Sequence, residues 1–194
     1  MNIYTVSFLL ILILNLIKNR RSLTMLQKNL YNENNRYLKW VFKNWKTIFV
    51  SLDFISLIFL LLAYILDNDL SIYLVIISFI IYLLEITRIL NNDKLYMNEK
   101  KLVITKRVKR LLFTLAVLFL LPIIFYLVDD KNIYLTLVIE GFITYFSYLM
   151  VVVAEIINIP VERIVYNYYA IKAKNKLKDM KNLKVIGITG SYGK

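Results

Sequence analysis

The chain has 194 residues, 59% of them hydrophobic, and a mean hydropathy of +0.61. This is more apolar material than one small soluble core can bury. The first class that the composition excludes is therefore a soluble enzyme. The sequence contains no cysteine and no histidine, which excludes disulfide frameworks, thiolate zinc sites, cysteine nucleophiles and the commonest metal ligand and general base. The formal net charge of +12 suits either nucleic acid or an anionic membrane surface.

Five apolar segments are long enough to be considered as membrane helices. A helix needs about 20 residues to cross a hydrocarbon core of roughly 30 Å. In chain order the expected spans are residues 3–17, 47–66, 70–90, 111–128 and 133–157. Short acidic turns at 67–69 and 129–132 join two of the pairs into hairpins. We therefore expect residues 1–159 to form an all-α integral membrane domain of five helices.

The first apolar segment is short enough to be confused with a signal peptide. No basic residue precedes it and no small-residue cleavage site follows it, while Lys18, Arg20 and Arg21 come directly after it. We expect a retained membrane anchor.

The basic residues predict the orientation of the bundle. Eight Lys or Arg lie in each of the segments 18–46, 88–110 and 163–194, and Lys131 is the remaining one. Cytoplasmic loops carry an excess of Lys and Arg. The alternation predicts an N-terminus outside and a C-terminus in the cytoplasm of a multi-pass cell-membrane protein. The charge then indicates contact with anionic lipids of the cytoplasmic leaflet, and no nucleic-acid partner is expected.

Four carboxylates interrupt the apolar segments, and an ionised carboxylate at mid-depth costs a few kcal/mol. They are Asp53, Glu85, Glu140 and Glu155. Asp53 and Glu155 lie near cytoplasmic ends, and Glu85 can pair with Arg88 one turn later, so these three are expected to be paired or to snorkel. Glu140 lies about 10 Å from the outer end of its span at helical rise. It should face the bundle or be protonated, and it is a membrane-embedded site candidate, with a simple packing contact as the alternative.

Other features of the spans have structural interpretations. Pro122 removes one backbone hydrogen bond and should kink the fourth span. Aromatic residues near span ends are expected to anchor the helices at headgroup depth. These are Tyr4, Trp40, Trp45, Tyr64, Tyr73, Tyr126 and Tyr134. No His/Asp/Glu cluster has metal-ligand spacing, so no metal site is predicted.

Residues 160–182 are expected to form a basic cytoplasmic linker helix. Pro160 suits a first helical position, with Glu162 in the first turn and Lys172 to Lys178 near the other end. Apolar residues recur at helical spacing, which is typical of an amphipathic helix lying on the membrane. Specific recognition of a lipid or partner is the alternative.

Residues 183–189 change character, because they are short, β-branched and bounded by glycine, as in a buried strand. The turn Gly190-Ser191-Tyr192-Gly193-Lys194 follows at once. Glycines let backbone N–H groups converge on phosphate oxygens, and a lysine places a cation beside them. The common phosphate-loop pattern has glycine where this chain has Ile188. The segment is either the start of an α/β nucleotide-binding domain or an accidental glycine turn.

The sequence of residues 185–194, Val-Ile-Gly-Ile-Thr-Gly-Ser-Tyr-Gly-Lys, resembles the ATP-binding loop of the Mur ligase family. Within the family it looks most like the UDP-N-acetylmuramoyl-tripeptide–D-alanyl-D-alanine ligases. The resemblance implies ATP-dependent amide formation through an acyl phosphate, with ATP and Mg²⁺ as cofactors of the intact enzyme. It implies that Lys194 contacts the phosphates, that Gly190, Ser191, Tyr192 and Gly193 supply backbone donors, and that Thr189 shapes the turn.

The resemblance covers about a dozen residues, and membrane spans replace the UDP-sugar domain of the soluble family members. We therefore expect a membrane-tethered, Mur-ligase-like protein of peptidoglycan precursor synthesis, truncated at its ATP-binding loop in residues 183–194. This fragment should hold no cofactor, have no catalytic residues and be inactive. Its expected partners are the bilayer and other proteins of cell-envelope synthesis. The alternative is a small polytopic membrane protein, an adaptor or a lipid-handling or transport subunit. A transporter would use Glu140.

Overall fold

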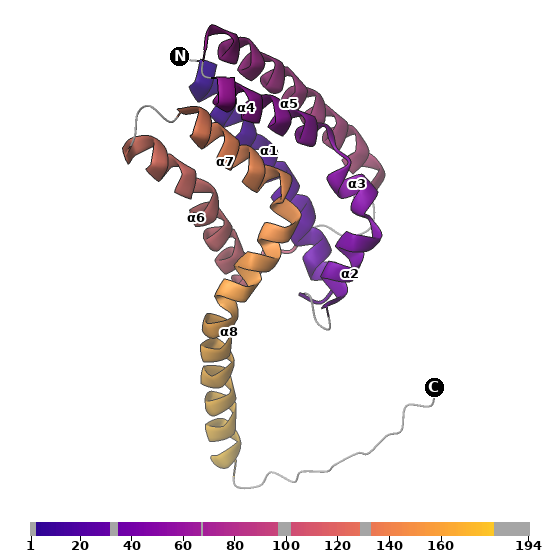
Figure 1. Cartoon of the computed structure of the whole chain (residues 1–194). Coiled ribbons are helices and arrows are strands. Elements are labelled where there is room, and N and C mark those ends of the chain that lie inside the picture. Colours follow the sequence, from indigo (N-terminus) through magenta and orange to yellow (C-terminus); the bar gives the residue numbers. More distant parts are fainter. Residues whose placement is uncertain (1–2, 32–34, 67, 97–101, 129–132, 181–194) are drawn as a thin grey trace. The chain divides into compact units, whose positions relative to one another are not determined.

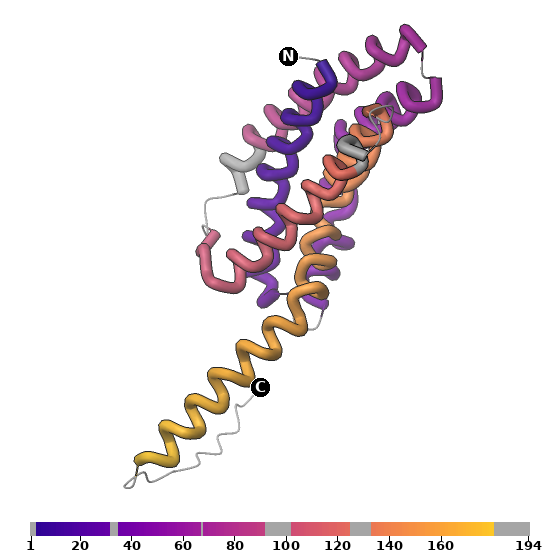
Figure 2. Tube along the Cα trace, turned by 90° about the vertical axis from the view of Figure 1, so that its left-hand side faces the viewer, coloured from indigo at the N-terminus to yellow at the C-terminus, as the bar shows by residue number. Residues whose placement is uncertain are grey.

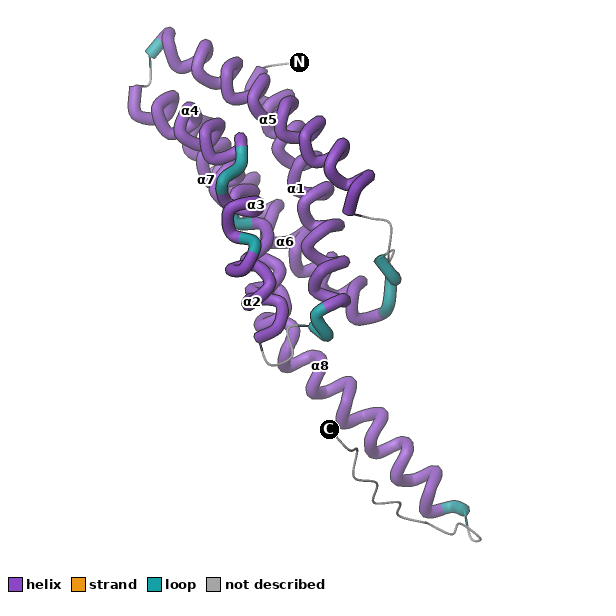
Figure 3. The backbone as a smooth tube through the Cα atoms, turned by 90° about the vertical axis from the view of Figure 1, so that its right-hand side faces the viewer, coloured by secondary structure: helices purple, strands orange, loops and turns teal. Residues whose placement is uncertain are grey.

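The computed structural model describes residues 3–31, 35–66, 68–96, 102–128 and 133–180 (Figure 1). Across these ranges every regular element is an α-helix (Figure 3). In chain order they are α1 (Ile3–Lys28), α2 (Arg36–Lys43), α3 (Trp45–Phe49), α4 (Leu52–Leu66), α5 (Asp69–Tyr96), α6 (Lys106–Val128), α7 (Ile133–Tyr145) and α8 (Ser147–Lys178). The chain divides into two compact units, Met1–Asn158 and Ile159–Lys194.

Two helices are long and apolar enough to cross a membrane. They are α1 and the Asp69–Asn91 part of α5. Helices α7 and α8 pass the same test together but are bent by 83° at the break between them, so the count is three if this pair forms one span. The fold is therefore all-α, and the chain has the helices of a membrane protein.

Among the described residues, five continuous spans are not found. The expected span 47–66 is divided, because α3 ends at Phe49 and Val50 adopts a non-helical ψ of 75°, which leaves α4 with 15 residues. The expected span 133–157 is divided by the bend after Tyr145. The expected span 111–128 lies in a helix that begins with the basic turn Lys106–Arg110. Hydropathy alone detects apolar runs but not the backbone breaks within them.

The beginning of the linker helix is also corrected. Pro160 lies inside α8, so no new helix starts there. A proline within a helix removes only its own N–H bond and disturbs one preceding carbonyl, which a helix can absorb. Pro122 likewise lies inside α6. The expected strand at 183–189 and the glycine turn after it lie outside the described residues.

Four helices of the first unit form the bundle that holds the buried polar residues. Helix α4 contacts α5 and α7, and α1 contacts the same two helices. Figure 2 shows the same helices as a tube, with α1 in indigo at the start of the chain. The buried side chains of α5 recur every three or four residues, in the order Ser71, Val75, Ser78, Tyr82, Glu85 and Ile89. Small residues allow close approach of membrane helices, and the Ser56 hydroxyl donates to the Ser78 carbonyl at 2.9 Å.

A second core lies where α2 and α3 meet α1, α6 and the first turns of α8. Tyr37 is fully buried there, and its ring lies 6.0 Å from that of Trp40. Trp40 in turn packs against Tyr148. Two of the aromatics that were expected at the interface contact each other, since the hydroxyls of Tyr4 and Tyr134 are 2.9 Å apart. Trp45, Tyr64 and Tyr73 are exposed.

Candidate functional site: a buried polar layer

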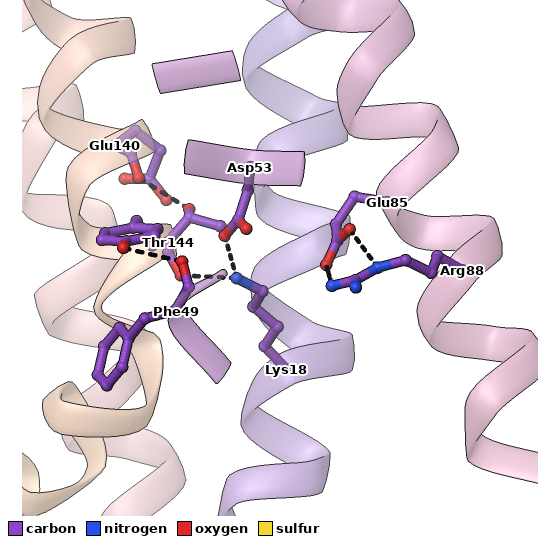
Figure 4. A network of polar contacts seen from close by, with 8 residues as sticks. Lys18, Phe49, Asp53, Glu85, Arg88, Glu140 and Thr144 are labelled. Carbon is purple, nitrogen blue, oxygen red and sulfur yellow. Dashed lines mark hydrogen bonds and ion pairs between the residues drawn. The ribbon is translucent and has the colours of Figure 1, made fainter. Parts of the chain in front are cut away.

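Seven of the residues that bring polar groups into the bundle or to its edge lie near one another, and we call them the polar layer. Figure 4 labels all of them except Asn15. They are Asn15 and Lys18 of α1, Asp53 of α4, Glu85 and Arg88 of α5, and Glu140 and Thr144 of α7. All except Arg88 are buried. Charged groups in an apolar bundle are costly unless they are paired, so the partner of each one indicates its state.

Lys18 is the central cation of the layer. Only 2% of its surface is exposed, and its ammonium group forms an ion pair with the carboxylate of Asp53, which is fully buried. The same nitrogen lies 3.4 Å from the carbonyl oxygen of Thr144. From the sequence, Lys18 was expected in a basic flank after a span that ends at residue 17. The structure places it inside the bundle, because α1 continues to Lys28.

Glu140 is fully buried, so it faces the bundle interior. The side-chain amide of Asn15 donates to its Oε1 at 2.7 Å, while Oε2 has no hydrogen-bond partner. One turn later, the Thr144 hydroxyl donates to the Glu140 backbone carbonyl at 2.8 Å. Gly141 allows the close approach of α5, because a Cβ there would lie 2.9 Å from the Tyr82 hydroxyl. A functional role for Glu140 stays a prediction.

The pairing expected for Glu85 is confirmed. Arg88 donates to both of its carboxylate oxygens at 2.7 Å, from Nε and from an Nη atom. Glu155 is also paired, with Arg107 at 3.0 Å, and this bridge is more exposed than the Lys18–Asp53 pair. All three carboxylates that were expected to be paired or to snorkel therefore have a cationic partner.

The polar side of α1 was not predicted from the sequence. Asn15, Lys18, Asn19 and Ser22 are all buried. Their spacing of three, one and three residues puts them on one face of a helix, one turn after another. That spacing is the sequence signal for a buried polar face, and it extends beyond the expected span 3–17 because α1 continues to Lys28.

The predicted nucleotide-binding residues, Thr189 to Lys194, lie outside the described residues. In the described ranges no group of three or more Asp and Glu side chains could hold a metal ion. The arrangement that can be examined chemically is thus the polar layer, which holds acids, bases and amides in an apolar bundle.

No protein-family model, no curated protein and no solved structure matches this chain.

Proposed function

We propose that this chain anchors a Mur-ligase-like, ATP-dependent enzyme of peptidoglycan precursor synthesis to the membrane. The observation that carries the proposal is the sequence of residues 185–194, which follows an apolar helical bundle in the same chain. In the intact enzyme, ATP and Mg²⁺ would convert a substrate carboxylate into an acyl phosphate, which an amino group then displaces. Lys194 and the backbone N–H groups of residues 190–193 would hold the nucleotide phosphates.

The proposed topology has five passes, with the N-terminus outside and the C-terminus in the cytoplasm. It is supported by the three basic segments, which alternate with two acidic turns along the sequence. It requires that α4 crosses beside α5 and that α6 crosses despite its basic start. ATP is a cytoplasmic substrate, so this topology places the glycine turn on the side where the nucleotide is found.

Anionic lipids are the proposed partners of the basic end of α8. Lys172, Lys174, Lys176 and Lys178 are all exposed in the second unit, together with apolar side chains such as Ile164 and Ile171. Each such cation near an anionic leaflet contributes on the order of 1 kcal/mol. This segment would hold the nucleotide-binding part close to membrane-bound precursors and to other proteins of cell-envelope synthesis.

The coding sequence that follows the Lys194 codon tests the proposal directly. We expect a Ser or Thr codon next, because a phosphate loop uses that hydroxyl for Mg²⁺, and then several hundred codons with α/β periodicity in one of the frames. In the protein encoded by that longer frame, Lys194→Ala should abolish ATP-dependent amide formation, whereas Lys181→Ala should leave it unchanged. A following sequence with no such pattern in any frame would show that the ligase proposal is wrong.

A further inference from the structure

Glu140 differs from the other three acids of the apolar segments, because it has no cationic partner in the part of the chain that the structure describes. Asp53 is paired with Lys18, Glu85 with Arg88 and Glu155 with Arg107. Glu140 instead accepts a hydrogen bond from a neutral amide, that of Asn15. A fully buried carboxylate without a cation is the most costly state that an acidic side chain can have in an apolar bundle.

The groups that face Glu140 from the neighbouring helices cannot supply the missing positive charge. Lys18 of α1 is bound to Asp53 of α4 and, more weakly, to the Thr144 carbonyl, so its charge is already paired with another acid. Tyr82 of α5 is neutral and reaches the adjacent Gly141. In its described residues up to Ile124, α6 carries charged side chains only in the turn Lys106–Arg110.

The hydrogen bonds around Glu140 lack a donor. Two buried oxygens of this pair, Oε2 of Glu140 and Oδ1 of Asn15, have no donor. Both are acceptors if Glu140 is ionised, and two acceptors cannot bond each other. A proton on Oε2 removes the negative charge and turns that oxygen into a donor, while the Asn15 amide still donates to Oε1.

We propose that Glu140 and Asn15 form a proton-binding site, in which Glu140 is held as the neutral carboxylic acid and Oε2 carries the proton. The ligand is a single proton taken up from water, and it balances the two acids and one base formed by Glu140, Asp53 and Lys18. The proposal does not depend on the ATP-binding loop, so it can hold whether or not the chain belongs to a ligase.

A hydrophobic carbodiimide tests the site in the full chain at neutral pH. The neutral acid adds across a C=N bond of the reagent, its proton moves to nitrogen, and an acyl shift leaves a stable N-acylurea on the side chain. We expect this adduct on Glu140 by peptide mass spectrometry, its loss in Glu140→Gln, and no adduct on the paired Asp53. In Lys18→Met, Asp53 loses its partner and should become reactive, which shows that the reagent enters the bundle. Modification of Asp53 in that variant without modification of Glu140 in the wild type overturns the proposal.

Infrared spectroscopy of the wild type gives a second measurement that does not depend on reagent access. The carbonyl stretching band of a neutral carboxylic acid should be present in the wild type and lost in Glu140→Gln. Its absence from the wild type overturns the proposal. Slower carbodiimide labelling on addition of Na⁺ would also overturn it, since it would show that a metal cation occupies the site.

Thermal unfolding compares the two acids through matched neutral substitutions. Glu140→Gln replaces a neutral acid by a neutral amide and should change the melting temperature by only a few degrees. Asp53→Asn leaves Lys18 buried and unpaired, so the melting temperature should fall on the order of 10 °C. Equal losses in the two variants would contradict a neutral Glu140.

Discussion

At the scale of single residues, Lys18 and Asp53 illustrate the difference between removing one charge and removing a pair. Either ion alone would be left in an apolar interior, whereas the two together are neutral. Lys18→Met should lower the free energy of unfolding by about 3–5 kcal/mol. The double variant Lys18→Met/Asp53→Leu should recover most of that loss, since it leaves no buried charge. Unfolding in a mild detergent, followed by circular dichroism, measures both variants.

The Arg107–Glu155 bridge provides the control for this comparison. Its arginine side chain is 36% exposed, and pairs of that kind contribute about 0–1 kcal/mol. Arg107→Met should therefore cost far less than Lys18→Met, apart from the loss of the contact between the guanidinium and the Tyr31 ring, 4.1 Å from its centre. If both lysine and arginine variants cost the same, the low-dielectric setting assigned to Lys18 is wrong.

Tyr37 predicts a pH dependence outside the candidate spans. Burial raises the pKa of its hydroxyl well above the ordinary value of about 10, and that hydroxyl donates to the Tyr148 carbonyl at 3.0 Å. Above pH 10 the unfolded chain releases this proton while the folded chain retains it. Stability is therefore fully present below pH 10 and falls as the pH rises, by about 1.4 kcal/mol for each unit above it. Unfolding measured between pH 8 and 11.5 should show this slope.

Tyr37→Phe separates the slope at Tyr37 from that of the other tyrosines. The variant should lose about 1 kcal/mol at neutral pH, because the Tyr148 carbonyl loses its donor. Above pH 10 it should be less sensitive to pH than the wild type by the contribution of one group. A variant with the wild-type slope would show that Tyr37 titrates normally.

The residue identities that the sequence could supply were those with a local partner. Glu85 and Arg88 are one helical turn apart, so their pairing follows from helical geometry alone. The partners of Asp53 and Glu140 are 35 and 125 residues away in the chain, and only the packing of α1 against α4 and α7 brings them together. Long-range contacts of this kind cannot be derived from one sequence.

At the scale of elements, Gly141 determines how closely α7 approaches its neighbours. A Cβ at this position would lie 2.9 Å from the Tyr82 hydroxyl and 3.1 Å from a methyl group of Leu60. Gly141→Ala should therefore lower the free energy of unfolding by about 1–3 kcal/mol, even though alanine is the better helix former. Thermal unfolding in detergent provides the measurement.

Removal of the Tyr82 hydroxyl should relieve this contact in part. We expect Gly141→Ala/Tyr82→Phe to be more stable than the sum of the two single changes allows, by about 0.5–1 kcal/mol or more. Additive effects of the two changes would mean that α7 shifts away from α5 instead. Val153→Ala, at a 39% exposed position of α8, is a control for unspecific effects of a small substitution.

The sequence predicted helical elements well, but not their ends. Apolar runs correctly indicated α1, α4, α5, α6 and α7, because apolar composition persists along each of them. The pattern of apolar residues did not predict that the chain would leave helical geometry at Val50 or bend after Tyr145. At the second of these breaks, Phe146 packs against Phe49, with ring centres 6.2 Å apart. Such contacts belong to the assembled bundle and not to the segment.

At the scale of the whole molecule, three charged residues of the polar layer, Lys18, Asp53 and Glu85, lie at a similar distance from one end of the bundle. At helical rise, Lys18 is about 22 Å from Ile3, Asp53 about 20 Å from Leu66, and Glu85 about 24 Å from Asp69. Those three helix ends lie at the same end of the bundle (Figure 1). Three chain segments thus present an apolar section of similar length before the first buried charge, which fits a common membrane boundary for α1, α4 and α5.

This common level favours a crossing by α4 despite its 15 residues, and Asn68 tests it. With the N-terminus outside, five passes place Asn68 outside the cell. Crossing by α1, α5 and the α7–α8 pair alone places it in the cytoplasm. The chain has no cysteine, so Asn68→Cys is a unique site for an impermeant thiol reagent. The substitution removes the cap that the Asn68 side chain provides for the Leu70 N–H at 3.1 Å, at a cost of about 1 kcal/mol.

We expect Asn68→Cys and Asn132→Cys to react in intact cells, and Asn182→Cys to react only after the membrane is permeabilised. That result would follow from the positive-inside distribution of the three basic segments and the charge-free section above the polar layer. Protection of position 68 in intact cells, with labelling after permeabilisation, would mean that α4 stays on the cytoplasmic side. Asp53 would then lie on a helix that does not cross, and its ion pair with Lys18 would join that helix to the spanning helix α1.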